Sequence, residues 1–269
     1  RADRLAHLAA GSAMADFLSF MASLAGAQSA ALETLTANTP SQAFPSQGMT
    51  PRDRARWRPG RSWQRVLAII LDRLRTTPLT EETRAALECL AGQDANALDA
   101  LAERAVHFAS GEAEPAQACL AFAALQVCWT HGASLFAPED VRLPEGDGAC
   151  PICGSPPVSS IVHAAGPVAG VRFRVCALCA TEWHLVRIKC ANCHSTKGIA
   201  YLEIEGGVGL VKAETCDECR TYTKIIYIEK DPNAEVFADD LATLGLDIMV
   251  DEAGWRRATP NPFLLPGGG

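Results

Sequence analysis

The sequence predicts an α+β protein, in which a helical N-terminal domain precedes a duplicated, cysteine-rich β domain and a C-terminal helix. Apolar residues recur at helical spacing through the first half, and β-branched and aromatic runs replace the alanines in the second. Eight of the 11 cysteines form four Cys-x-x-Cys pairs in that second half. We therefore expect a helical domain over residues 1–140, two four-cysteine units over 149–189 and 190–230, and a C-terminal helix and tail over 231–269.

The composition is that of a chain that folds throughout. Of its 269 residues, 48% are hydrophobic and 20% are charged, which excludes a disordered or collagen-like protein. With 24 basic and 31 acidic residues the net charge is −7, so no overall basic field attracts nucleic acid or anionic lipid. The first residues lack the apolar core of a signal peptide, and the uncharged run Pro115–Pro138 is alanine-rich, as in a buried helix. We expect a cytoplasmic protein without membrane insertion.

Helix starts in the first half are predicted from capping residues. Ser62, Thr80 and Asp94 each precede apolar residues at spacings of three and four, and a further helix is expected from about 114 to 131. The stretch from 39 to 61 holds four prolines and five arginines, which break the helical pattern and predict a long loop.

Short strands and one helix are predicted in the second half. The strands are expected at Ile161–Val162, Val171–Val175, Leu185–Ile188, Leu210–Val211 and Ile225–Ile228. One helix follows from Asp231-Pro232, which supply a cap and a first-turn proline, to Gly254. Between Asp231 and Gly254 there are seven acidic residues and no Lys or Arg, which predicts a solvated acidic face.

The cysteine pairs form an internal duplication. They are Cys150/Cys153, Cys176/Cys179, Cys190/Cys193 and Cys216/Cys219. Each cysteine of the first two pairs is followed 40 residues later by a cysteine of the last two. Within each unit 22 residues separate the pairs, which is long enough for a two-stranded excursion that folds the second pair back onto the first. We favour sequential pairing into two sites over a cross-braced arrangement.

Two Cys-x-x-Cys pairs supply four thiolates in tetrahedral array, the coordination of a structural zinc site or of a rubredoxin-type iron. The β domain is therefore predicted to be rubredoxin-like or zinc-ribbon-like, with one ion in each unit. Gly154 follows the first pair and is free to adopt the left-handed conformation, whereas Ala180, His194 and Arg220 hold the corresponding positions after the other pairs. This departs from a strict rubredoxin pattern, and the spacing alone leaves iron and zinc open. Thioredoxin-like redox chemistry and haem attachment fit four paired motifs poorly.

Several motifs around the cysteines resemble a known family. They are Cys150-Pro-Ile-Cys153-Gly154-Ser155, Cys179-x-Thr181-Glu182-Trp183-His184, Lys212-Ala213-Glu214-x-Cys216, Lys230-Asp231-Pro232 and Asn261-Pro262-Phe263. With these motifs the sequence resembles the formate dehydrogenase accessory protein family, FdhE. The resemblance implies a cytoplasmic accessory protein, not an enzyme, that is required for active formate dehydrogenase and binds its catalytic subunit. It also implies two rubredoxin-like iron ions, with zinc as the alternative.

A second class of function remains open, an electron-transfer protein with two rubredoxin-type irons. No nucleotide-binding loop, nucleophile elbow or paired acid and base suggests catalytic residues outside the cysteine sets.

The partner surface is predicted beside the metal sites. Trp183 and His184 closely follow a cysteine pair, and Arg187 and Lys189 alternate with apolar residues on the expected strand. Together with Tyr222 they would form one polar and aromatic docking face. The competing interpretation is that Trp183 only covers the metal.

Overall fold

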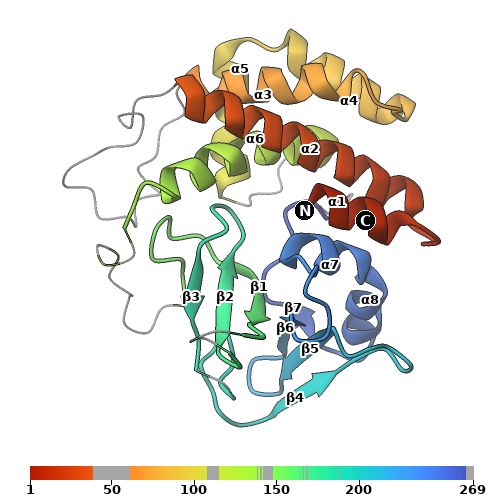
Figure 1. The fold of residues 1–269 in the computed structure, drawn as a ribbon, viewed down its shortest axis with the longest axis vertical. Helices are drawn as coiled ribbons and strands as arrows, with labels where there is room; N and C mark the ends of the chain where they lie inside the picture. Colours follow the sequence, from red (N-terminus) through yellow and green to blue (C-terminus); the bar gives the residue numbers. More distant parts are fainter. Residues whose placement is uncertain are drawn as a thin grey trace.

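The computed structural model describes residues 1–38, 61–107, 115–137, 139, 141, 148–165, 167, 169–186 and 188–264. A layer of helices lies on one side of the molecule and a mixed β-sheet on the other, with the last helices beside the sheet (Figure 1). The predicted α+β class is confirmed. The predicted arginine-rich loop lies outside the described residues except for Arg61.

The described part of the N-terminal half contains six helices. They are α1 (Ala2–Ala9), α2 (Ala15–Asn38), α3 (Arg61–Leu74), α4 (Glu81–Gly92), α5 (Ala95–Val106) and α6 (Pro115–Ala133). Two predicted caps are confirmed, since the side chains of Thr80 and Asp94 accept hydrogen bonds from the backbone N–H groups of Thr83 and Ala97. Ser62 is instead the second residue of α3.

The alanine-rich helix α6 is the centre of the helical layer. It packs against α2, α3, α4 and α5, and a continuous run from Leu120 to Trp129 is buried. The predicted buried helix is therefore confirmed. Among the residues that the structure describes, no helix combines the length and apolar character needed to cross a bilayer.

The sheet is built from two copies of one three-stranded unit. The strands are β1 (Pro157–Val162), β2 (Arg172–Cys176), β3 (Glu182–His184), β4 (Ile199–Leu202), β5 (Val211–Cys216), β6 (Thr221–Tyr227) and β7 (Arg256–Arg257). Their order is β3-β2-β1-β6-β5-β4, with β7 pairing to β6. Each unit is an antiparallel meander, and the parallel pairing of β1 with β6 joins the two units.

The duplication extends to the strand register. Phe173 on β2 faces His184 on β3, and the residues 40 positions later, Ala213 and Lys224, face each other in the same way. The other hairpin of the first unit contains an irregularity between Pro157 and Ser159, which offsets its register from that of the second unit.

Two buried arginines on β2 connect the units further. The guanidinium of Arg172 forms a bidentate ion pair with Glu214 on β5, with N–O distances of 2.5 and 3.0 Å. Arg174 donates a hydrogen bond of 2.8 Å to the carbonyl of Ala191, which lies between two cysteines of the second unit. The two units therefore share a sheet and buried polar contacts.

The prediction of a strand at Leu185–Ile188 is wrong. Strand β3 ends at His184, and Ile188 adopts a positive φ of 59°, which no strand residue has. The β-branched residues of this stretch, Val186 and Ile188, are 60% and 64% exposed and belong to the connection between the units. The N–H of Leu185 still donates to the carbonyl of Arg172 on β2 at 3.0 Å, but the positive φ of Ile188 ends the extended conformation despite the strand propensity of these residues.

The single C-terminal helix predicted from Asp231 is also wrong. It is divided into α7 (Val236–Ala242) and α8 (Leu244–Glu252), which Thr243 separates. The side chain of Glu235, not Asp231, caps α7 by accepting a hydrogen bond from the N–H of Ala238.

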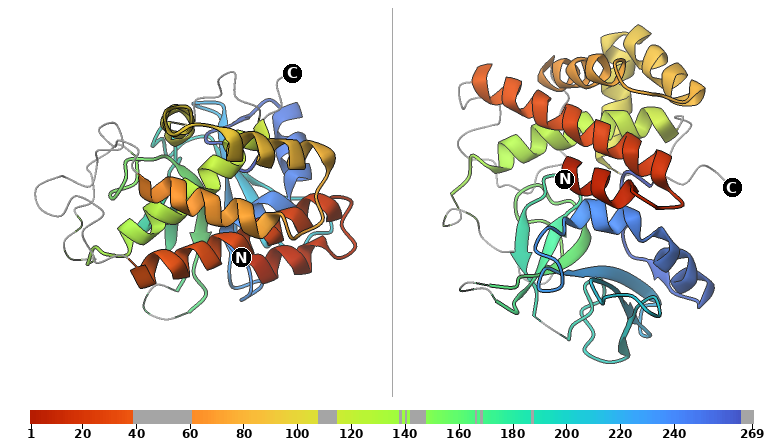
Figure 2. Two further views of the ribbon diagram at one scale, coloured as in Figure 1. Left: turned by 90° about the horizontal axis from the view of Figure 1, so that it is seen from above. Right: turned by 45° about the vertical axis from the view of Figure 1, so that its right-hand side comes forward.

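The acidic face of these helices is solvated only in part, since Asp239, Asp240 and Asp247 are buried whereas Asp251 and Glu252 are exposed. Asp239 pairs with Arg4 of α1 at 2.6 Å, whereas Asp240 pairs with Arg257 of β7 and Lys224 of β6 at 2.7 and 3.3 Å. The cations lie outside the segment, Lys224 and Arg257 just beyond its two ends and Arg4 at the start of the chain, so counting charge within the segment missed them. Helix α7 therefore lies between α1 and the sheet (Figure 2), and buried apolar residues from Leu5 to Phe263 belong to one cluster.

Candidate metal centres

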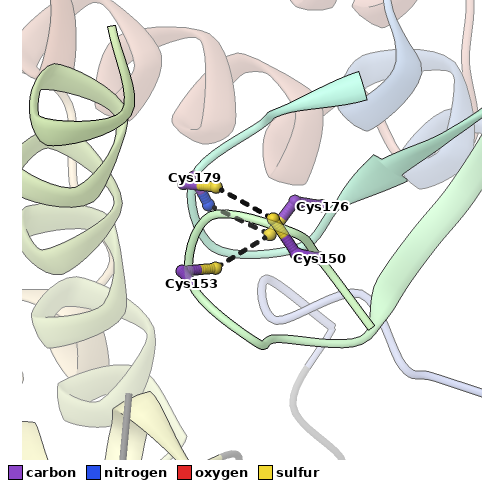
Figure 3. A group of neighbouring side chains, drawn as sticks. All are labelled: Cys150, Cys153, Cys176 and Cys179. Carbon is purple, nitrogen blue, oxygen red and sulfur yellow. Dashed lines mark hydrogen bonds between the residues drawn. The ribbon is translucent and has the colours of Figure 1, made fainter. Parts of the chain in front are cut away.

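The first four-cysteine site joins the segment before β1 to the turn after β2. The sulfur atoms of Cys150, Cys153, Cys176 and Cys179 converge on one point (Figure 3), and all four lie within 4.8 Å of one another. The Cys150–Cys179 and Cys153–Cys176 sulfur distances are 3.5 and 3.3 Å. All four residues are buried, so this site is enclosed by protein.

The second site repeats this arrangement 40 residues later. It contains Cys190, Cys193, Cys216 and Cys219, again within 4.8 Å of one another. The Cys190–Cys219 and Cys193–Cys216 sulfur distances are both 3.7 Å. The cysteines are thus grouped sequentially along the chain, two pairs to a site, and not in a cross-braced arrangement.

The backbone at the Cys-x-x-Cys turns aims N–H groups at sulfur. In the turn after β2, the N–H groups of Leu178 and Cys179 both donate to the sulfur of Cys176 at 3.4 Å. In the second unit, the N–H groups of Asn192 and Cys193 donate to Cys190 at 3.3 and 3.4 Å. Such bonds stabilise a thiolate.

The residue after each pair has a positive φ, whether or not it is glycine. The values are 71° at Gly154, 55° at Ala180, 64° at His194 and 53° at Arg220. Three of these positions lack the glycine of a strict rubredoxin pattern. Their backbone nevertheless has the same left-handed conformation as that of Gly154. Three residues tolerate the left-handed conformation because the surrounding turn requires it.

Two threonines were missed by the sequence reasoning. The hydroxyl oxygens of Thr181 and Thr221 lie 3.0 Å from the sulfur atoms of Cys179 and Cys219. They occupy equivalent positions, two residues after the last cysteine of each unit. The 40-residue repeat could therefore have indicated that both threonines contact the metal sites.

The geometry of both sites fits a tetrahedral metal ion. A metal–sulfur distance of about 2.3 Å corresponds to sulfur–sulfur distances of about 3.8 Å. The observed distances lie near this value and are too long for a disulfide bond, which is about 2.05 Å. Four sulfur donors without a nitrogen or oxygen donor suit zinc or iron. Each site is therefore able to bind one such ion.

The thiols of each site differ in acidity. In the first site, a hydrogen bond from Cys150 holds the pKa of Cys153 well below its usual value, whereas burial raises the pKa of Cys176. In the second site, burial raises the pKa of Cys190 to about 12. Burial acts in the same direction on Cys219, but hydrogen bonds, led by that of Thr221, lower its pKa to about 6. A metal ion must displace the protons of thiols with a raised pKa, such as Cys176 and Cys190, so binding weakens in acid.

Helix α6 covers the first site. The side-chain amide of Gln126 on α6 donates a hydrogen bond of 3.1 Å to the carbonyl of Ala177, between Cys176 and Cys179. Its oxygen accepts hydrogen bonds from Arg1 at 2.8 Å and from Gln28 of α2 at 3.2 Å. One buried glutamine therefore connects three parts of the helical half to the first site.

The second site is more open. Cys193 is exposed and Cys219 is partly exposed, although Cys190 and Cys216 are buried. The sequence carries a signal for this difference that was missed. The residues between the cysteine pairs are Pro-Ile and Ala-Leu in the first unit, all buried, and Ala-Asn and Asp-Glu in the second, where only the alanine is buried.

The predicted partner-binding residues do not share one surface. Trp183 and Tyr222 are only 6% and 3% exposed, which corrects the expectation that they contribute to a docking face. Trp183 is the inward residue of a short strand, and the hydroxyl of Tyr222 donates to Asp247 of α8 at 2.8 Å. His184 is exposed and Lys189 is half-buried, whereas Arg187 lies outside the described residues.

Comparisons with known proteins cover almost the whole chain. Family models described as "FdhE, N-terminal", "FdhE, central domain" and "FdhE, C-terminal domain" match residues 1–145, 149–187 and 188–264. A protein FdhE homolog from Serratia proteamaculans (strain 568) is 39% identical over 99% of this chain and 87% of its own length. A homolog from Cronobacter sakazakii (strain ATCC BAA-894) is 38% identical over 100% of this chain and 88% of its own.

A crystal structure shares the fold. It is that of the FdhE protein from Pseudomonas aeruginosa, with a TM-score of 0.86 and 34% sequence identity. The similarity covers 99% of this chain and 95% of that chain.

Proposed function

Because the chain belongs to the FdhE family, we propose that it is an accessory protein required for active formate dehydrogenase. In this role it binds the catalytic subunit in the cytoplasm through its metal-stabilised β domain. The observation that carries the proposal is the pair of complete four-cysteine sites within a fold shared over 99% of the chain with an FdhE crystal structure. A reducing compartment suits sites built from reduced thiols.

The proposed cofactors are two iron ions, one in each four-cysteine site, with zinc as the alternative. The chemistry of the donor set supports either metal, and the family resemblance favours iron. Bound iron would add one-electron redox chemistry to the structural role that either metal fulfils. Elemental analysis is expected to give two ions per chain, and ferric thiolate absorption is expected in protein purified in air with iron supplied. One ion per chain would contradict the two-site proposal.

The docking surface is proposed around His184 and Lys189, next to the connection between the two units. Both side chains are at least partly accessible, and the exposed Val186 and Ile188 lie between them in sequence. Exposed apolar side chains near a lysine suit binding to a protein surface. Arg187 belongs to the same proposal, whereas Trp183 and Tyr222 would only support the surface from inside.

The experiment combines capture of the partner with reconstitution of activity. The full chain is used to capture the formate dehydrogenase catalytic subunit, and His184→Ala and Lys189→Ala are compared with the wild type. Both variants are expected to keep two metal ions and to bind the subunit at least tenfold more weakly. Lys230→Ala, which removes an exposed lysine near the end of β6, is the control and is expected to bind normally. Unaltered binding by both variants would move the interface elsewhere, and absence of any capture would contradict the accessory role.

The alternative function, electron transfer through two rubredoxin-type irons, is favoured by one observation at one site. Cys193 of the second site is exposed, which would bring a bound iron close to a redox partner. A reversible one-electron couple in the isolated iron-loaded protein would support this function. If zinc-loaded protein reconstituted formate dehydrogenase normally, electron transfer by this protein would not be needed for that activity.

A further inference from the structure

The two four-cysteine sites differ in accessibility although their ligands and backbone are repeated. Every cysteine of the first site is 2% exposed or less, whereas Cys193 is exposed and Cys219 partly exposed in the second. Ala177 and Leu178 of the first unit are buried, but the equivalent Asp217 and Glu218 are exposed. Solvent therefore reaches one edge of the second site and none of the first.

The partners that enclose the first site are not duplicated. Gln126 of α6 holds the carbonyl of Ala177 in place, and the buried Pro151 and Ile152 complete the apolar cover on the other cysteine pair. In the second unit the exposed Asn192 takes the place of Ile152, and its amide donates to the sulfur of Cys219 at 3.8 Å and to the hydroxyl of Thr221 at 3.3 Å. Apart from the bond from Arg174 of β2 to the carbonyl of Ala191, the contacts at this edge of the second site among the described residues are local and polar, and they leave Cys193 exposed.

An external ligand can reach only the second site without unfolding of the helical half. Exchange of a thiolate ligand requires that the incoming sulfur approach the ion while the old ligand is still bound. In the first site, such an approach would require α6 to separate from the segment between Cys176 and Cys179. In the second site, the exposed Cys193 edge is open to the incoming group.

We propose that the second site is an exchange-competent metal site, which passes its ion to and from external thiols at Cys193, whereas the first site exchanges its ion at least tenfold more slowly. In the step, the sulfur of an external thiol forms a bond to the ion, and the bond from Cys193 to the ion breaks. The proton of the external thiol passes to the released Cys193, so the ion keeps four thiolates and neither sulfur changes oxidation state. The inference rests on the metal occupancy proposed above but not on the formate dehydrogenase partner.

The test is metal release from the full chain loaded with two equivalents of zinc under argon. A chromophoric zinc indicator serves as the sink, and free cysteine is the external thiol. One equivalent is expected to leave at least tenfold faster than the other, and only the fast phase is expected to accelerate with thiol concentration. Release of both equivalents at one rate, or a fast phase independent of thiol, would overturn the inference. Failure to take up two equivalents would instead overturn the metal occupancy itself.

The released ion can be located in the wild-type protein, without a variant that might not fold. After the fast phase, alkylation and mass spectrometry are expected to find label on Cys190, Cys193, Cys216 and Cys219, while the first four cysteines stay protected. Equal labelling of both sets would contradict the inference.

A variant tests the cause of the difference. Gln126→Ala removes the hydrogen bond from α6 to the first site, so the slow phase is expected to accelerate and the fast phase to stay unchanged. Gln117→Ala, on the same helix, is the control and is expected to leave both phases unchanged, since the side chain of Gln117 accepts a hydrogen bond of 3.5 Å from Gln93 at the end of α4. If Gln126→Ala altered the fast phase alone, burial by α6 could not be the reason for the difference.

Discussion

The two four-cysteine units have the same ligand spacing and the same register between their second and third strands, yet they stand in different surroundings. The first unit is enclosed by α6 through Gln126, whereas the second keeps an exposed cysteine and contacts the C-terminal helices through Lys224. A duplicated sequence therefore produced two similar metal cages. Their stability and accessibility come from parts of the chain that were not duplicated.

The largest difference is expected when equivalent ligands are removed. Cys176→Ser and Cys216→Ser each abolish a metal site, at a cost of roughly 10 kcal/mol of metal-binding free energy. Cys176→Ser is expected to reduce the helical far-UV circular dichroism as well, because its turn packs on α6. Cys216→Ser is expected to loosen the second unit, most of all around its cysteine turns, and to leave the helical signal unchanged, which hydrogen exchange would localise. Equal loss of helical signal in both variants would contradict both this comparison and the proposed domain boundaries.

A second test compares the stability contributed by Lys224 with that contributed by His184, the residue 40 positions earlier in the first unit. Lys224 is buried against Asp240 and Asp247, at 3.3 and 2.6 Å, whereas its equivalent His184 is exposed. Lys224→Met is expected to cost about 3–5 kcal/mol in the free energy of unfolding, because it leaves buried carboxylates with fewer cations. His184→Met is the control and is expected to change stability by less than about 0.5 kcal/mol.

The pH dependence of the Lys224→Met variant follows from Asp240. Burial acts to raise the pKa of this carboxyl, but Arg257 and Lys224 together hold it below its usual value of 3.8. A lowered pKa stabilises the fold above the unfolded value and loses that effect as the pH falls through the folded value. The stability deficit of Lys224→Met is therefore expected to be full at pH 7 and to shrink below about pH 4, as denaturant titrations at the two pH values would measure. A deficit that grew in acid would contradict the ion pair as its cause.

A smaller effect is expected when the cover of the first site is weakened. Gln126→Ala leaves the Ala177 carbonyl without its side-chain donor and removes the acceptor of Arg1 and Gln28. The expected cost is about 2–3 kcal/mol in the free energy of unfolding, measured by denaturant titration of the metal-loaded protein. Gln117→Ala should change it by less than about 0.5 kcal/mol. A cost no larger than this control would mean that apolar packing alone closes the first site.

The smallest effects concern the backbone conformation that all four turns share. Gly154→Ala places a Cβ at a φ of 71° and is expected to destabilise the protein by about 1 kcal/mol. Ala180→Gly at a φ of 55° is expected to stabilise it by up to about 1 kcal/mol. Thermal unfolding of the metal-loaded variants would measure both, and a shift of the same sign in both would contradict the role of the left-handed conformation.

Much of this protein could be predicted from short-range sequence patterns. The four cysteine pairs and their 40-residue repeat indicated two sequential sites, which the structure contains. Thr80 and Asp94 cap the helices they were expected to cap, and the alanine-rich run forms a buried helix. These features depend on residues that are close in sequence, so spacing and residue type suffice to predict them.

The sequence by itself determined the ligand sets, the duplication and the α+β class, whereas the tertiary structure decided which groups are accessible. Trp183 and Tyr222 proved buried, the acidic face of the last helices proved paired with Arg4, Lys224 and Arg257, and only the second metal site proved open. These outcomes depend on contacts between separate elements of the fold, such as Arg4 with Asp239 or Gln126 with Ala177. Local charge and periodicity carry no information about such partners, because burial is a property of the packed molecule and not of the segment.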